Sequence, residues 1–184
     1  MDIDQEKERQ ITLIVPTVHH RSRLFARVLR YFTERGFRSP IIVTDHSPPE
    51  NDRVISDIAA RHGDLDLRVL RHSPDIHFLE RLISCAKEAH TPYVHLHADD
   101  DFVLRPMLAR LAQELHEKPG CAAAMGINVH AEFASRDLTV ASKGNIGGRT
   151  PFDRLLAQLE SYSSVRSEEH TSELQSRSDL VCRL

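Results

Sequence analysis

Short, continuous apolar runs alternate along the chain with segments in which apolar residues recur every three or four positions. The runs predict strands buried on both faces, as in a parallel sheet, at residues 11–15, 40–44, 65–70 and 93–97. The periodic segments predict helices at residues 21–35, in a short stretch ending near residue 61, and at residues 76–89, 106–118 and 151–162. This alternation predicts an α/β fold with a mostly parallel sheet covered by helices on both faces.

Two segments near the end of this pattern are less regular. Residues 121–129 are apolar enough to predict a fifth strand. Residues 142–150 hold three of the seven glycines, which indicates a loop.

Composition narrows the class of protein. The chain has 184 residues, 40% hydrophobic and 28% charged, which indicates a single globular domain. Its formal net charge of -3 lacks the basic excess typical of nucleic-acid-binding proteins. No apolar run approaches the roughly 18 residues that span a bilayer, and the polar N-terminal decapeptide is unlike a signal peptide. We therefore expect a cytoplasmic protein with no nucleic-acid partner and no transmembrane segment.

The last segment, residues 166–184, shows neither apolar periodicity nor helix-capping residues. Its first part, RSEEHTSELQS at residues 166–176, resembles the in-frame translation of a sequencing-library adapter. We interpret residues 166–184 as an artefactual or disordered tail. Residues 1–165 are then the natural domain, which we expect to be incomplete at its C-terminus.

The predicted topology places three loops at one edge of the sheet. In a parallel sheet, ligands bind outside the carboxyl ends of the strands. The residues that follow those ends here are 16–21, 45–47 and 99–101. These three loops form the candidate site.

Three consecutive carboxylates stand in the last of these loops. In an extended chain Asp99 and Asp101 point to one side and Asp100 to the other. Two carboxylates on one face repel unless a cation or hydrogen-bond donors neutralise them, and a hard divalent ion such as Mn²⁺ or Mg²⁺ suits such ligands. Spacing alone supports equally well a helix cap and a solvated turn.

Three motifs occur in a characteristic order along the chain: ITLIVPTVHHRSRL, IIVTDHS and TPYVHLHADDDFVL. This set resembles the family-2-type glycosyltransferases of the GT-A fold, which carry a strand-Pro-Thr loop, a strand-Asp-Ser loop and an Asp-x-Asp motif. The helix FLERLISCAKEA is similar to the segment that in this family carries an Arg near the nucleotide. RTPFDRLLAQLESYSSV resembles a later helix of one bacterial subgroup, so the resemblance covers residues 11–165.

The resemblance implies a nucleotide-sugar site. Asp45 would hold the nucleoside, and Asp99 and Asp101 would frame the metal ion and the diphosphate. The same resemblance places these residues at the donor: Pro16, Thr17, Arg21, Arg81 and Asp100. The chain departs from the commonest family pattern by having Asp45-His46-Ser47 where a second acidic residue is usual.

Each assignment has a simpler structural alternative. Asp45 could close an Asx turn in a proline-rich loop. Arg21 could be a solvated residue in the first turn of a helix, and Arg81 a surface or ion-paired helical residue.

The function implied is metal-dependent transfer of a sugar from a nucleoside diphosphate donor to an acceptor hydroxyl, in polysaccharide or glycoconjugate assembly. The acceptor is not specified by the sequence. An inverting enzyme of this kind needs a carboxylate base to take the proton of the acceptor hydroxyl. In the family that base lies well downstream of the Asp-x-Asp motif, so we expect it to be missing here and nominate no catalytic residue.

Three other functions remain open at this stage. A GT-A-like domain can bind nucleotide without chemistry. His95, His97 and Asp99 alternate along a strand, as in a metallo-hydrolase, although their interpretation as packed strand residues is simpler. A sugar nucleotidyltransferase usually has a Gly-rich, basic loop after the first strand, and PTVHHRSRL contains no glycine.

Overall fold

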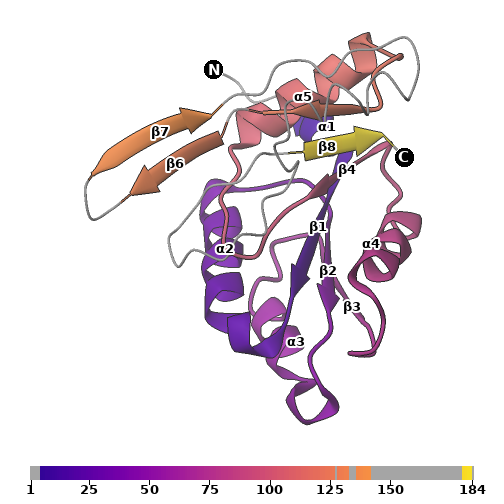
Figure 1. Cartoon of the computed structure of the whole chain (residues 1–184), viewed down its shortest axis with the longest axis vertical. Coiled ribbons are helices and arrows are strands. Elements are labelled where there is room, and N and C mark those ends of the chain that lie inside the picture. The colour runs from indigo at the N-terminus through magenta and orange to yellow at the C-terminus, as the bar shows by residue number, and fades with distance from the viewer. Residues whose placement is uncertain (1–4, 127, 133–135, 142–179, 184) are drawn as a thin grey trace, which may run out of the picture. The chain divides into compact units, whose positions relative to one another are not determined.

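The computed structural model describes residues 5–126, 128–132, 136–141 and 180–183. The chain divides into two compact units, of which the first comprises residues 1–125 and 179–184 and the second residues 126–178. The second unit contains one antiparallel hairpin, in which β6 (Asn128–Glu132) pairs with β7 (Asp137–Ala141). All elements described below belong to the first unit (Figure 1).

The first unit is built on a mostly parallel sheet, as the alternating pattern predicts. Its strands are β1 (Ile11–Thr17), β2 (Ile41–Asp45), β3 (Leu67–Arg71), β4 (Tyr93–Leu96), β5 (Ala123–Met125) and β8 (Leu180–Arg183). The strand order is β3-β2-β1-β4-β8-β5. Strands β3, β2, β1 and β4 run parallel, and β8 is antiparallel to both of its neighbours.

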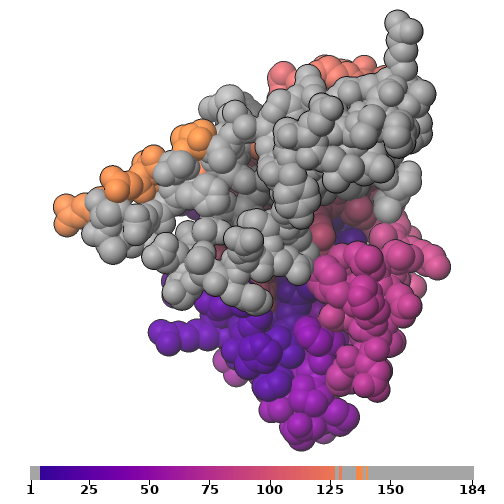
Figure 2. Space-filling model, viewed as in Figure 1, coloured from indigo at the N-terminus to yellow at the C-terminus, as the bar shows by residue number. Residues whose placement is uncertain are grey.

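Helices cover both faces of this sheet, which confirms the predicted fold class. They are α1 (Gln5–Glu8), α2 (Ser22–Arg35), α3 (Val54–Ala59), α4 (Phe78–Lys87) and α5 (Arg105–Glu117), with short 3₁₀ turns η1 (His19–Arg21) and η2 (Pro49–Asn51). Helices α2 and α3 lie on one side of the strands and α4 on the other, and the two sides also form separate flanks in the space-filling view (Figures 1 and 2). No described helix has both the length and the apolar character needed to cross a membrane.

The central strand β1 contributes to two separate cores because its side chains alternate between the faces. Leu13 and Val15 pack with buried residues of α2, α3 and α5. Ile14 packs on the opposite face with Cys85 of α4. A continuous apolar run is therefore required on β1, and this requirement is why the sequence pattern identifies it.

Strand β1 extends past Pro16, although a strand ending at residue 15 was predicted. The N–H of Leu13 donates to the oxygen of Pro40 on the β2 side, and successive residues donate on alternate sides. The nitrogen of Pro16 therefore faces β4, whose last registered pair with β1 is Ile14 with Leu96. Proline is tolerated here because the absent N–H removes no bond of the sheet.

Three other boundary predictions have different outcomes. The single strand predicted at residues 121–129 is wrong, because β5 and β6 are separate strands in different units. The predicted loop at 142–150 and helix at 151–162 lie outside the described residues. Within the segment interpreted as a tail, residues 180–183 form strand β8, and the origin of residues 166–184 stays a prediction.

A buried ion pair joins helix α1 to helix α5. Glu8, the last residue of α1, is fully buried. Its Oε1 accepts a hydrogen bond from the backbone N–H of Arg38 at 2.7 Å, and its Oε2 accepts from Nε of Arg105 at 3.0 Å and Nη2 at 2.8 Å. Arg105 also donates to the backbone oxygen of Arg35. This carboxylate therefore ties α1 to α5 and to the end of α2.

Replacing Glu8 tests that role. Glu8→Ala leaves the half-buried guanidinium of Arg105 without its partner, and we expect the free energy of unfolding to fall by about 3 kcal/mol. Urea unfolding followed by circular dichroism measures the change. The control is Glu6→Ala, an exposed position on the same helix, which we expect to change stability by no more than about 0.5 kcal/mol. Equal effects of the two substitutions would contradict the assignment.

Candidate functional site

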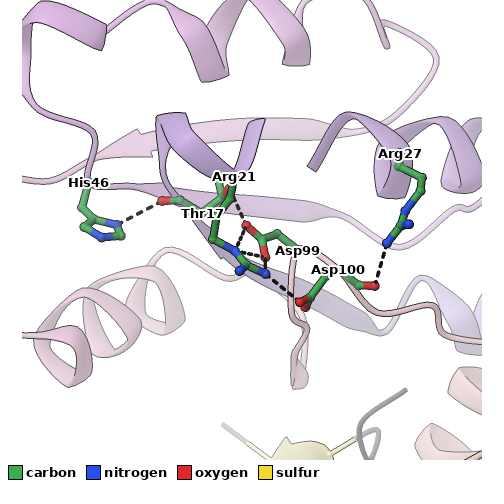
Figure 3. A network of polar contacts seen from close by, with 6 residues as sticks. All are labelled: Thr17, Arg21, Arg27, His46, Asp99 and Asp100. Atoms are coloured by element: carbon green, nitrogen blue, oxygen red, sulfur yellow. Dashed lines mark hydrogen bonds and ion pairs between the residues drawn. The ribbon is translucent and has the colours of Figure 1, made fainter. Parts of the chain in front are cut away.

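The carboxyl ends of β1, β2 and β4 bring the predicted loops together. Thr17 and Asp45 are the last residues of adjacent parallel strands and are partners in the register. Oγ1 of Thr17 donates a 2.7 Å hydrogen bond to Oδ2 of Asp99, which follows β4 (Figure 3). The expectation that these loops lie at one edge of the sheet is therefore confirmed.

Arg21 neutralises the carboxylates of this edge. It is the last residue of η1, directly before α2. Its Nε donates to both oxygens of Asp99, at 2.8 Å and 3.0 Å, and its Nη2 lies 2.6 Å from Oδ1 of Asp99 and 2.7 Å from Oδ2 of Asp100 (Figure 3). The hydrogen bond to Asp99 is the main cause that raises the pKa of Arg21, so the guanidinium stays charged. Arg21 is therefore ion-paired with both aspartates, and its side chain is still 37% exposed.

The three consecutive aspartates adopt a turn, so the expected alternation of an extended chain is wrong. Residues 99 and 100 are in a turn, and the N–H of Asp101 donates to the oxygen of Ala98 at 3.5 Å. This turn directs Asp99 and Asp100 to a common partner, Arg21. Asp101 is itself buried, with 6% of its surface exposed.

The arrangement of Asp99 does not fit the divalent ion that the resemblance implies. Both oxygens of Asp99 accept hydrogen bonds from Thr17 or Arg21, and Oδ2 of Asp100 is paired with the same guanidinium. Among the described residues, no group of three or more His, Cys, Asp or Glu side chains is placed to hold a metal ion. The assignment of Asp99 and Asp101 as metal ligands stays a prediction, and no step of the proposed reaction is derived through a metal.

Asp45 is fully buried at the end of β2 and uses one oxygen in an Asx turn. Its Oδ1 accepts from the N–H of Ser47 at 2.9 Å and from Oγ of Ser47 at 2.5 Å. Its Oδ2 is buried and, among the described residues, has no hydrogen-bond partner. The Asx turn is therefore confirmed, and it leaves a second, unused acceptor in a fixed orientation.

Arg81 of α4 is buried, with 6% of its surface exposed, so the alternative of a surface residue is wrong. Within the described part of the chain its Nε and Nη1 have no hydrogen-bond partner, and its guanidinium lies 5.5 Å from the ring of Phe78. Burial is the main cause that lowers the pKa of Arg81. Leaving buried donors of a charged group without acceptors is unfavourable.

The charges of both Asp45 and Arg81 affect the pKa of His46. Burial lowers the pKa of His46 and the charge of Arg81 lowers it further, whereas Asp45 raises it. Nδ1 of His46 is 3.0 Å from the backbone oxygen of Thr17 (Figure 3). The pKa of His72 is also lowered, by burial and then by Arg81. Both imidazoles are thus biased toward the neutral form beside a buried cation.

The two histidines of β4 and its extension belong to the core rather than to a hydrolase site. His95 and His97 are 1% and 2% exposed. The ring of His97 lies 5.3 Å from that of Phe32 on α2, and the two imidazoles are 5.4 Å apart. The interpretation of these residues as packed strand residues is confirmed, and the structure gives no support to a metallo-hydrolase.

Two neighbours of the site had no individual predicted role, although Ser47 lies in the predicted loop 45–47. Ser47 fixes Asp45, and its Oγ also accepts from the N–H of His19 at 2.8 Å. The Asp-x-Ser spacing after a strand could have identified this turn. Nη2 of Arg27 on α2 donates to the backbone oxygen of Asp100 at 3.4 Å, and only the tertiary structure reveals that contact (Figure 3).

This edge of the sheet offers two kinds of recognition. Asp45 supplies a buried hydrogen-bond acceptor that is unused, and Arg81 supplies buried donors that are unused. Arg21 supplies a guanidinium whose side chain is 37% exposed beside buried Asp99. The first pair suits the edge of a planar heterocycle, and the second group suits an anion.

No protein-family model and no curated protein matches this sequence. Among solved structures, the mannosyltransferase PcManGT from Pyrobaculum calidifontis, in complex with GDP-Man and Mn²⁺, matches with a TM-score of 0.54 and 21% identity, over 67% of this chain and 36% of that one. TarS 1–349 of S. aureus in complex with UDP-GlcNAc matches with a TM-score of 0.48 and 18% identity, over 62% of this chain and 32% of that one.

A third match is the CMP:2-keto-3-deoxy-manno-octonic acid synthetase complexed with CTP, with a TM-score of 0.49 and 11% identity, over 94% of this chain and 73% of that one. This chain spans about a third of the length of the mannosyltransferase, 36%. At these identities the comparisons concern the fold alone. The chain therefore has an α/β fold of the GT-A type, as found in nucleotide-sugar transferases.

Proposed function

We propose that this chain binds the nucleoside diphosphate of a sugar donor at the carboxyl ends of β1, β2 and β4, as part of an enzyme that transfers the sugar to an acceptor hydroxyl. The observation that supports the proposal most is the pair of unsatisfied groups at Asp45 and Arg81. Buried polar atoms without partners are rare, and they are expected where a ligand supplies the missing partner.

Asp45 favours a nucleobase that carries an N–H. Ser47 holds Oδ1 with two hydrogen bonds, so the carboxylate cannot rotate freely and Oδ2 stays available as an acceptor. A carboxylate oxygen accepts from an imino N–H, as found in uracil, thymine and guanine. Cytosine presents a bare ring nitrogen at the corresponding position, which would face this acceptor unfavourably.

Arg81 favours a carbonyl next to that N–H. Its unpartnered Nε and Nη1 can donate only, because a guanidinium has no acceptor. A base with adjacent N–H and C=O groups offers a donor that suits Asp45 and an acceptor that suits Arg81. The mannosyltransferase of the same fold is in complex with GDP-Man, whose base has this edge.

The diphosphate would then lie toward the first loop and the aspartate turn. Arg21 provides the positive charge there, and charge-assisted hydrogen bonds from a guanidinium to phosphate oxygens are strong. A cation at this place stabilises the negative charge that develops on the leaving diphosphate. Thr17 acts through Asp99, whose Oδ2 it holds, and Pro16 precedes it on β1 as the register partner of Thr44. The catalytic base and the acceptor site are not assigned.

A calorimetric panel of nucleoside diphosphates tests the base assignment. We expect the full chain to bind GDP or UDP, and to bind CDP and ADP at least about tenfold more weakly, because a mismatched hydrogen-bond edge leaves buried groups unpaired. Equal affinity for all four nucleotides would contradict a role of Asp45 and Arg81 in base recognition. Absence of binding by a folded sample would contradict the proposed donor site.

Asp45→Asn gives a sharper test, because it changes one atom. Ser47 holds Oδ1, so the new amide nitrogen takes the place of Oδ2 and donates where the carboxylate accepted. We expect affinity for GDP and UDP to fall about tenfold and the preference to move toward CDP. The matched control is Asp57→Asn at an exposed position of α3, with no expected change. A uniform loss of affinity for every nucleotide would instead indicate a structural role of Asp45.

A further inference from the structure

We propose that Arg21 is the resident counter-ion of the aspartate turn and that a divalent cation competes with it for the carboxylates of Asp99 and Asp100. The aspartate turn is then not a preformed metal site in the nucleotide-free protein. The guanidinium must leave Asp99 before a metal ion can use that carboxylate. The part of this inference that concerns the diphosphate rests on the proposed function, whereas the part that concerns the metal does not.

Both carboxylate oxygens of Asp99 already accept hydrogen bonds from the protein. Oδ1 lies 2.6 Å from Nη2 and 2.8 Å from Nε of Arg21, and Oδ2 accepts from Thr17 at 2.7 Å and from Nε of Arg21 at 3.0 Å. Each oxygen therefore meets two donors. A hard cation binds to the same carboxylate lone pairs at 2.0 to 2.6 Å, so it must displace at least one of these donors.

Asp100 extends the competition to a second carboxylate. Nη2 of Arg21 bridges Oδ1 of Asp99 and Oδ2 of Asp100, at 2.6 Å and 2.7 Å. The guanidinium thus contacts both carboxylates, as Figure 3 shows. A second cation placed beside a retained guanidinium would also be repelled by it.

The exposure of the two partners makes an exchange feasible. The side chain of Asp99 is 4% exposed and fixed by Thr17, whereas that of Arg21 is 37% exposed. The carboxylate is therefore the fixed partner, and the arginine is the one that can move. A diphosphate offers a guanidinium the same bidentate geometry as a carboxylate. A bound diphosphate would draw Arg21 from Asp99 and free that carboxylate for a metal ion.

Mn²⁺ binding without nucleotide tests the competition directly. Free Mn²⁺ is titrated into the full chain and its paramagnetic resonance signal is followed. We expect Arg21→Gln to bind Mn²⁺ at least about tenfold more tightly than the unaltered protein, since charge-assisted hydrogen bonds no longer hold the carboxylates. The double variant Arg21→Gln with Asp99→Asn should lose this gain.

Arg27→Gln is the matched control for charge. Arg27 lies near the same turn, but the contact described for it there is with the backbone oxygen of Asp100 and not with a carboxylate. Both substitutions remove one positive charge from the neighbourhood, and only Arg21→Gln frees carboxylate oxygens. Equal gains in Mn²⁺ affinity for the two variants would overturn the proposal in favour of a general electrostatic effect.

The same substitution should have the opposite effect on affinity for a nucleoside diphosphate. Without metal, Arg21→Gln should bind the preferred nucleoside diphosphate about tenfold more weakly than the unaltered protein, because the phosphate loses a charged donor. If Mn²⁺ affinity rises but no diphosphate binds either protein, the proposed function fails and the competition stands. If Mn²⁺ affinity does not rise in folded Arg21→Gln, the competition is overturned.

Circular dichroism establishes that each variant is folded. Arg21→Lys is the conservative variant should Arg21→Gln not fold. It keeps the charge but loses the bidentate geometry, so we expect Mn²⁺ affinity between those of the unaltered protein and the glutamine variant. Affinity no higher than that of the unaltered protein would then overturn the proposal.

Discussion

The buried carboxylate of Asp99 is the constraint on which the candidate site depends. Asp99 is 3% exposed, and a buried carboxylate stays charged only where hydrogen-bond donors satisfy its oxygens. Thr17 at the end of β1 and Arg21 in the turn that follows β1 supply these donors. Because the donors come from one end of β1 and the acceptor follows β4, the interaction fixes two loops that are far apart in sequence. The geometry of the predicted donor site follows from that connection.

The parallel register of the sheet supplies the second half of the site. Pairing of Thr17 with Asp45 sets the ends of β1 and β2 level, so the Asx turn of Asp45 begins at the same edge as the aspartate turn. Helix α4 covers the opposite face from α2 and carries Arg81 to a buried place near His46. The two faces of the sheet therefore contribute different chemistry, with Arg21 from the α2 side and Arg81 from the α4 side.

Much of the architecture was predictable because the strands are buried on both faces. Residues 41–45 and 93–96 are recognisable from apolar runs alone, and Gly36 stops α2 in the left-handed conformation that glycine adopts without strain. Helix α1 was missed because its four residues are too short to show a period and its one buried residue is charged. The division of residues 121–132 between two strands depends on tertiary pairing, which local composition does not encode.

The sequence by itself determined the order along the chain of strands β1 to β4 and helices α2 to α5, and the three loops where ligand-binding residues would meet, because periodicity reports which side chains are buried. Only the tertiary structure decided the partners within those loops. Asp99 and Asp100 form a turn instead of the expected extended chain with alternating side chains, and both carboxylates pair with Arg21. Burial of Arg81 without acceptors likewise depends on how α4 packs on the sheet. Such pairings depend on distances between residues remote in the chain, which no local pattern of residues specifies.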